Sequence, residues 1–378
     1  AASDVYKRQP TGGEIIVDGR IGTMIVGGDF LAELLLNWDP SPVSPSNPEG
    51  PHEKYDPELI GRVPGPSLRL LRVRGDILGI GDIGGDVSAI ISGGDFGAFE
   101  ESFRVHGDLG RMIVGSTSPT GANLESSLVV DGDARRVVVF GDVNGKIDVT
   151  EDFGTLLLRA KGAGSRADLN GSISVGGDFR ALTIIGGDIA ATDILDGGPL
   201  TIDVAGTGPR QRVVGSDLGG ILTTTGSVNP INYDGSLLTG AAIISTGDVT
   251  RIHFGEDIQE GSYIVIDGDL DELIVDGSIS GQIHVTGDIG VLRTTNITST
   301  AVVTAAGDIG VIDVDNTVGP GTYVLAGYDP GVDMATLTDG VFGATELTVD
   351  GLAADPSEQV YAANIKSVKV GLLWDSVI

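Results

Sequence analysis

Carboxylates are the side chains in this sequence whose type and spacing could do chemistry. The chain has 378 residues, 53 of them acidic and 23 basic, with a formal charge of −30. Aspartate follows glycine fourteen times, where this composition would give roughly six such pairs by chance. If the pairs stack, neighbouring carboxylates repel by roughly 1 kcal/mol or more. A Ca²⁺ ion, which accepts six to eight oxygen ligands, would relieve that repulsion.

Two interpretations of these aspartates stay open. Either they are solvated side chains that cap backbone amides of turns, or they bind calcium between turns. The segment from Asp329 through Asp333 to Asp339 loosely resembles a calcium-binding loop. Its twelfth position, where such a loop has a glutamate ligand, is Gly340. These three aspartates are the candidate metal ligands. No cofactor is expected beyond calcium.

Signals for catalysis are missing from the sequence. There is no cysteine, and no nucleophile elbow, zinc-protease or phosphate-loop motif occurs. His253 and His284 have outward-facing parity on expected strands and are predicted to be surface residues. Polysaccharide-cleaving enzymes need paired carboxylates and aromatic platforms in a groove, for which Trp38 or Tyr233 would have to serve. We therefore predict that the chain is not an enzyme.

The charge of the chain also limits its partners. A net charge of −30 argues against binding to nucleic acid, which needs Lys and Arg to displace counterions. It likewise disfavours docking on anionic lipids. No apolar run approaches the ~20 residues that span a bilayer. The charge suits cations or cationic partners.

A repeat in the sequence sets the positions of these carboxylates. In thirteen of the fourteen pairs Ile, Leu, Val or Phe follows the aspartate, and only Ala134 departs from this rule. That residue commonly begins a string of apolar, two residues, apolar, one residue, apolar, as in Leu270, Leu273 and Val275. In the most regular stretch the pair begins at Gly247, Gly268, Gly287 and Gly307. A unit of about 20 residues with short strands, such as the one expected over 282–286, buries its apolar face only by stacking.

The sequence therefore predicts an all-β fold, a parallel β-helix or solenoid, right-handed, with rungs of about 20 residues. Glycine is expected to take the positive-φ conformation at each corner, and aspartate to cap local amides there. Leucine-rich repeats share the apolar string but need an Asn after it and a helical half. Calcium-binding nonapeptide rolls need a motif that is absent, and propellers need a period of forty or more residues.

The domain boundaries follow from breaks in the repeat. Residues 1–10 contain Asp4-Val5-Tyr6-Lys7-Arg8-Gln9, which resembles a translated sequencing adapter, so we expect an adapter-derived or disordered tail. Residues 11–318 are expected to form the β-helix. Residues 37–66 hold eight of the sixteen prolines and are predicted to leave the stack, because proline lacks the ladder donor. Residues 319–378 are expected to continue the solenoid with loop insertions to a truncated end.

The Gly-Asp-Ile/Leu turns, the segment Leu325-Ala326-Gly327-Tyr328-Asp329 and the segment Ile365-Lys366-Ser367-Val368-Lys369-Val370 together resemble large repeat-rich surface proteins of environmental bacteria, Planctomycetes in particular. The resemblance covers most of residues 11–378. It implies a fragment of a longer extracellular or cell-surface solenoid that serves display or adhesion, and it supplies no catalytic residues.

We therefore expect a structural or adhesive segment of a secreted or cell-surface bacterial protein. Its partners would be polysaccharide or other surface proteins. The alternative function is that of a carbohydrate-active β-helix which binds or cleaves an extracellular polysaccharide along one face.

Overall fold

The computed structural model describes residues 5–6, 14–17, 20–36, 68–98, 101–162, 165–195, 197–214, 217–228, 230–329, 359–360, 363–373 and 378. They form a parallel β-solenoid of about 12 turns with rungs of about 21 residues, and no helix occurs among them. The predicted fold class is confirmed, and the leucine-rich and propeller alternatives fail because the strands are parallel and no helical half exists. The chain divides into two compact units, Ala1–Phe179 with Ile194–Asp196, and Arg180–Asp193 with Gly197–Ile378.

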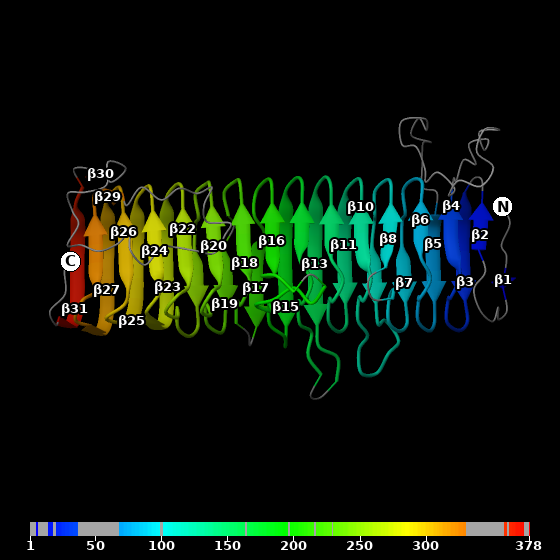
Figure 1. The fold of residues 1–378 in the computed structure, drawn as a ribbon, viewed down its shortest axis with the longest axis horizontal. Coiled ribbons are helices and arrows are strands. Elements are labelled where there is room, and N and C mark those ends of the chain that lie inside the picture. The colour runs from blue at the N-terminus through cyan, green and yellow to red at the C-terminus, as the bar shows by residue number, and fades with distance from the viewer. Residues whose placement is uncertain are drawn as a thin grey trace. The chain divides into compact units, whose positions relative to one another are not determined.

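The first unit contains two parallel sheets, which we call sheet A (odd-numbered strands) and sheet B (even-numbered strands) (Figure 1). The strands of sheet A are β1 (Val5–Tyr6), β3 (Ile21–Val26), β5 (Leu68–Val73), β7 (Ile90–Ser92), β9 (Met112–Val114), β11 (Ala134–Val139) and β13 (Phe153–Arg159). The strands of sheet B are β2 (Glu14–Val17), β4 (Glu33–Leu36), β6 (Gly81–Ile83), β8 (Ser102–Val105), β10 (Ser127–Val130), β12 (Ile147–Val149) and β14 (Ile173–Val175).

The second unit repeats this arrangement. Its sheet A holds β15 (Phe179–Ile185), β17 (Arg210–Val214), β19 (Ile231–Tyr233), β21 (Ile252–Phe254), β23 (Leu270–Ile279), β25 (Ile289–Ile297), β27 (Ile309–Val318) and β31 (Ile365–Leu373). Its sheet B holds β16 (Thr201–Val204), β18 (Ile221–Thr224), β20 (Ala242–Ser245), β22 (Tyr263–Ile266), β24 (Gln282–Val285), β26 (Val302–Ala305) and β28 (Tyr323–Ala326). A short antiparallel pair joins β29 (Tyr328–Asp329) to β30 (Gln359–Val360).

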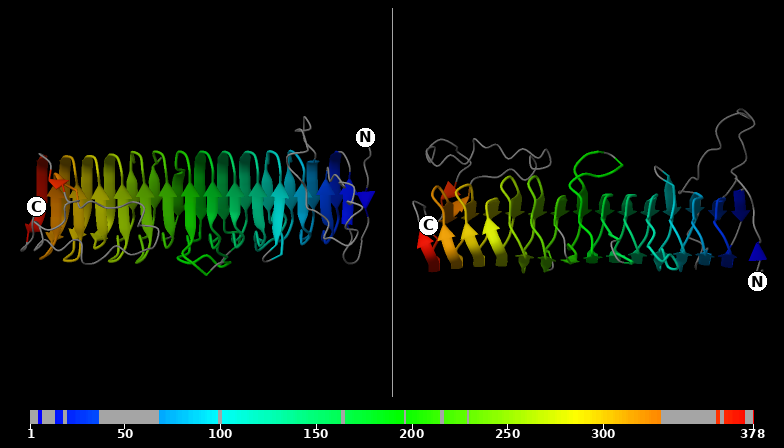
Figure 2. Two further views of the ribbon diagram at one scale, coloured as in Figure 1. Left: turned by 45° about the horizontal axis from the view of Figure 1, so that its top comes forward. Right: turned by 90° about the horizontal axis from the view of Figure 1, so that it is seen from below.

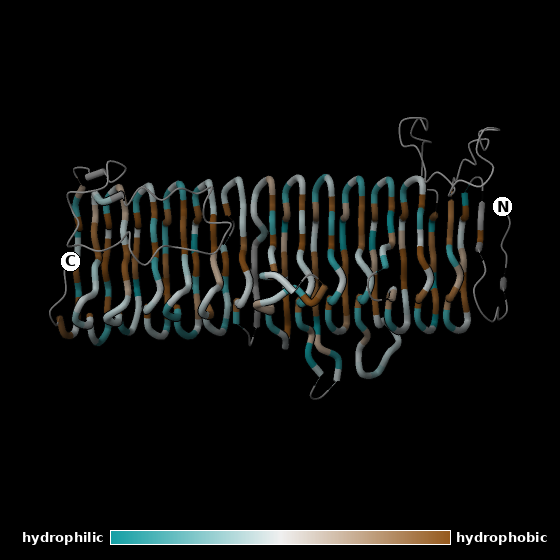
Figure 3. The backbone as a smooth tube through the Cα atoms, in the orientation of Figure 1, coloured by the Kyte–Doolittle hydropathy of each residue, from teal (hydrophilic) through white to brown (hydrophobic). Residues whose placement is uncertain are grey.

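The core of each unit lies between its two sheets, which appear as two layers of strands in Figure 2. The apolar string has the predicted role: Leu270, Leu273 and Val275 all point inward and are at most 1% exposed. Figure 3 shows the resulting apolar segments on strand after strand. Aromatic residues stack between rungs, as Phe153 and Phe179 do with ring centroids 4.7 Å apart. Each rung thus buries its apolar residues against the next rung as well as across the sheets.

The strand pairing shows where the repeat is interrupted. Most equivalent aspartates on neighbouring rungs lie 19 to 29 residues apart, but Asp29 and its partner Asp76 lie 47 apart. The extra chain falls between β4 and β5 and contains the proline-rich segment 37–66, which lies outside the described residues. Within segment 1–10, Val5 and Tyr6 pair with Ile25 and Val26 of β3.

Candidate functional site: carboxylate columns and the His106 cluster

Thirteen of the fourteen Gly-Asp aspartates, together with others such as Asp152 and Asp168, form columns along the corners of each unit, whereas Asp82 lies in β6. In each column a side-chain oxygen of one rung accepts a hydrogen bond from the backbone N–H of the equivalent residue on the next rung. One column of the first unit comprises Asp29, Asp76, Asp95, Asn123, Asp142 and Asp168, with N···O distances of 2.8–3.1 Å. The other comprises Asp86, Asp108, Asp133, Asp152 and Asp178, with distances of 2.9–3.1 Å.

The second unit has the same two columns. One comprises Asp188, Asp217, Ser236, Asp257 and Ser278, with N···O distances of 2.7–3.4 Å. The other comprises Asp248, Asp269, Asp288, Asp308 and Asn364, with distances of 2.7–2.9 Å. The aspartates therefore cap backbone amides as predicted, but the amide belongs to the next rung and not to the local turn.

The columns also account for many of the glycines that precede aspartate. Of the fourteen glycines, all within the described residues, Gly268 alone has a positive φ, and at 159° its backbone is close to extended. The prediction of positive-φ corners was therefore wrong for these pairs. A Cβ on Gly94 would instead lie well inside van der Waals contact with Asp76 Oδ1, the oxygen that accepts from Asp95. At Gly94 the carboxylate of the previous rung therefore occupies the space of a side chain. Glycine is not needed at every column position, because Glu151 and Glu256 precede the column residues Asp152 and Asp257.

The columns need a hydrogen-bond acceptor more than a charge. Asn123 Oδ1 accepts from the Asp142 N–H at 2.9 Å, and Ser236 Oγ accepts from the Asp257 N–H at 3.2 Å. Neither side chain is charged at neutral pH. Capping therefore accounts for the columns without a bound cation.

Burial makes the charge unfavourable at one column position. The pKa of Asp142 lies above its ordinary value because the carboxyl is partly buried and because Asp168 and Glu125 carry like charges nearby. The hydrogen bond from the Asp168 N–H, at 2.8 Å, offsets only part of this effect. The ionised Asp142 is thus less stable in the folded chain than in the unfolded one.

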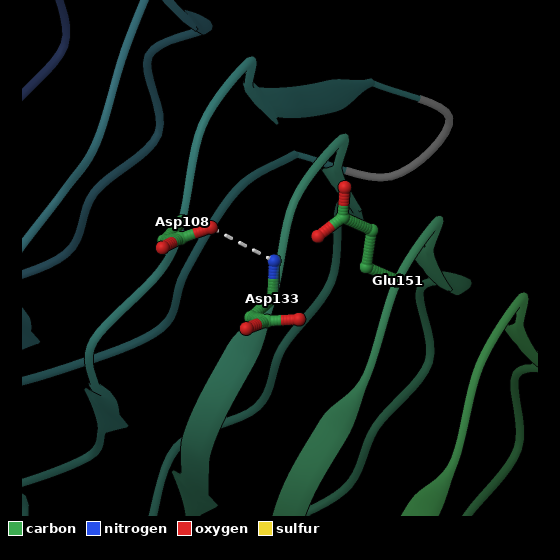
Figure 4. Close-up of side chains that lie close together, drawn as sticks. All are labelled: Asp108, Asp133 and Glu151. Carbon is green, nitrogen blue, oxygen red and sulfur yellow. Dashed lines mark hydrogen bonds between the residues drawn. The ribbon is translucent and has the colours of Figure 1, made fainter.

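Three carboxylates come closest to a cation site. One oxygen each of Asp108, Asp133 and Glu151 lie within 4.8 Å of one another, and Figure 4 shows them at one corner of the first unit. Asp108 Oδ1 already accepts from the Asp133 N–H at 3.1 Å. Since Ca²⁺ takes six to eight oxygens, water would have to supply most of the ligands here.

A second cluster joins three rungs of the first unit around His106. Its Nδ1 lies 2.6 Å from Asp131 Oδ2 and its Nε2 lies 2.8 Å from Asp82 Oδ1. Arg104 also reaches Asp131, with NH2 2.9 Å from Oδ1. Only 10% of the His106 side chain is exposed. Burial lowers the pKa of His106, but the two carboxylates outweigh it and hold that pKa above its ordinary value.

Sequence reasoning missed this cluster because its members lie 24 and 25 residues apart. A signal was present: His106 and Asp131 each directly follow the last inward valine of a strand, Val105 and Val130, which pair in register. Aligning the rungs on those valines would have placed the two side chains together.

The predicted site residues fall in different places. Asp329 ends β29, while Asp333 and Asp339 lie outside the described residues, as does Trp38. The calcium site at these aspartates therefore stays a prediction.

The prediction of a surface position is wrong for His284, and Tyr233 is not available as an aromatic platform. Tyr233 is fully buried and stacks on Phe254 with centroids 5.4 Å apart, so it lines no groove, and burial raises its pKa. His284 is 6% exposed although its parity points outward, because the outer face of sheet B is buried there, as neighbouring Val265 also shows. His253 is 26% exposed and lies 3.2 Å from Asp276.

The comparisons with known proteins give no family. No family model matches the chain, and neither a curated protein nor a solved structure matches it. Within the described ranges, no helix has the length and apolarity of a membrane span. The chemistry must therefore be argued from the chain's own geometry.

The glycine requirement can be tested with one pair of variants. Gly94→Ala should lower the free energy of unfolding of the first unit by about 1–3 kcal/mol, because the new Cβ displaces Asp76 from its hydrogen bond. Gly28→Ala is the control, since no atom lies within 4 Å of its added Cβ. Urea unfolding of both variants measures the difference, and equal stabilities would contradict the steric explanation.

The acceptor requirement predicts opposite results for two substitutions of Asp142. Asp142→Asn keeps the acceptor and removes an unfavourable charge, so stability at neutral pH should stay equal or rise. Asp142→Ala leaves the Asp168 N–H without its acceptor and should cost about 1–3 kcal/mol. The advantage of Asn over the natural Asp should shrink as pH falls through the folded-state pKa of Asp142. Thermal melts of the natural chain and both variants across pH measure these stabilities. An Asn variant as unstable as the Ala variant would exclude the acceptor explanation.

The His106 cluster predicts a loss of stability at alkaline pH. Because the folded-state pKa of His106 is raised, its contribution is complete below the unfolded-state pKa and is lost as pH rises through the folded-state pKa. The first unit should therefore lose stability as pH rises from below 6.5, the ordinary pKa of histidine, through the folded-state pKa of His106, and His106→Gln should abolish that dependence. Melting of both proteins, with an NMR titration of the His106 ring, tests it. A titration midpoint at or below that of a free histidine would contradict the prediction.

Proposed function

We propose that this chain is a structural or adhesive segment of a secreted or cell-surface bacterial β-solenoid protein, without catalysis. The observation that carries the proposal is that the columns of both units use their carboxylates to bond rung to rung. Residues that would otherwise be candidates for acid–base chemistry are thereby committed to the backbone. The extracellular location is supported by the resemblance to bacterial surface proteins alone.

The carbohydrate-active alternative has less support. Polysaccharide cleavage needs a groove with aromatic platforms and paired carboxylates. Tyr233, one of the two aromatic residues proposed for that role, is buried in the core. The remaining candidate, Trp38, lies outside the described residues.

An activity screen tests the absence of catalysis. The full chain, incubated with neutral and acidic polysaccharides with and without calcium, should release no reducing ends and form no unsaturated uronates. A variant with Asp108→Asn, Asp133→Asn and Glu151→Gln is the matched control, since it removes the triad charges and keeps the column acceptors. Depolymerisation by the natural chain that this variant loses would replace the structural proposal with an enzymatic one.

A further inference from the structure

One face of the first unit has a charge opposite to that of the chain as a whole. Strands β3, β5, β7, β9, β11 and β13 of its sheet A contain five arginines and no aspartate, glutamate or lysine. A further arginine, Arg111, directly precedes β9. In a chain of charge −30 these strands form an acid-free, basic surface, which we call the arginine face: Arg69, Arg72, Arg111, Arg135, Arg136 and Arg159.

The centre of the arginine face concentrates like charges. Val137 pairs with Met112, which places Arg136 beside Arg111 on the next rung, and Arg135 precedes Arg136 on the same strand. Neighbouring strands lie about 4.8 Å apart. All three side chains are exposed. Like charges on adjacent strands destabilise a sheet, so a nearby anion would relieve the repulsion.

No such anion is supplied by the described part of the chain. Among the described residues, no carboxylate forms an ion pair with any arginine of the arginine face. The second unit offers a comparison, because several cations of its sheet A pair with carboxylates, although β15 and β17 also contain arginines and no acid. Arg251 lies 3.4 Å from Glu272, Arg293 lies 3.6 Å from Asp313, and Lys369 lies 2.8 Å from Asp313.

Apolar side chains lie between the arginines. Ile25 is 51% exposed, and Ile91, Ile113 and Leu157 follow it along the same row with intermediate exposure. Arginine with aliphatic residues, and depletion of aspartate, glutamate and lysine, is the composition of a protein–protein interface. The arginine face thus fits an acidic protein surface better than a small anion.

We propose that the arginine face binds a carboxylate column of a second copy of this chain. The columns supply the opposite charge. Rungs have the same spacing in both surfaces, so Arg111 and Arg136 on neighbouring rungs can meet carboxylates on neighbouring rungs of the second copy. Two arginine faces could not pack on each other, because arginine would oppose arginine. The contact is therefore between unlike surfaces. Repeated head to tail it generates rings or open rows, and formed twice about a two-fold axis it gives a closed pair.

Sedimentation velocity of the full chain tests this proposal over a wide range of concentration, at physiological and at high ionic strength. The natural chain should associate as concentration rises, and high salt should weaken the association because exposed charges are screened. A triple variant, Arg111→Glu with Arg135→Glu and Arg136→Glu, should weaken association at least tenfold. The charge-matched control, Arg293→Glu with Lys366→Glu and Lys369→Glu, alters paired cations of the second unit and should associate like the natural chain.

A second variant tests the opposite surface and does not depend on the folding of the triple-Glu protein. Asp108→Asn, Asp133→Asn and Asp152→Asn keep the column acceptors but remove three charges, and association should again fall. A natural chain that stays monomeric at every concentration would overturn the proposal. It would also fail if the triple-Glu variant associated as well as the control, or if the arginines bound polygalacturonate without self-association. None of these results bears on catalysis, which the polysaccharide screen tests separately.

Discussion

The hydrogen bond from an aspartate oxygen to the backbone N–H of the next rung is the interaction on which the rest of this structure depends. At 2.7–3.4 Å it connects equivalent corners in both units, where the chain turns and sheet bonding is interrupted. It satisfies amides that the sheets leave without partners. Where glycine precedes the aspartate, as Gly94 does, the accepting oxygen fills the space in which a side chain would lie.

This use of aspartate has an electrostatic consequence. Columns of carboxylates raise the negative charge of the chain, and burial with like-charged neighbours raises the pKa of Asp142. Three column positions have no aspartate but keep the hydrogen bonding. Asn123 and Ser236 still supply the accepting oxygen, and the backbone N–H of Asn364 still donates to Asp308. Part of the acidity of the chain is thus a result of how its corners are built, and calcium binding is not needed to explain the columns.

The cations of the chain are distributed unequally. In the second unit most described cations of sheet A lie close to a carboxylate on a neighbouring rung. The strands of the arginine face in the first unit contain no carboxylate. His106, held between Asp82 and Asp131, shows that carboxylates on sheet B of the first unit do pair with cations. The difference therefore belongs to one face and gives that face a surface chemistry suited to an acidic partner.

The sequence by itself determined the fold class, the period and the inward residues, because strand alternation and the Gly-Asp pairs are local signals. Tertiary structure decided what depends on register between rungs. The oxygen of Asp76 reaches the amide of Asp95, 19 residues on, whereas Asp29 reaches that of Asp76, 47 residues on. Such variable spacing hides the His106 cluster and the grouping of Arg111 with Arg136 from any fixed-period alignment. Parity likewise could not show that His284 is buried, because burial depends on what packs over a face as well as on the direction of a side chain.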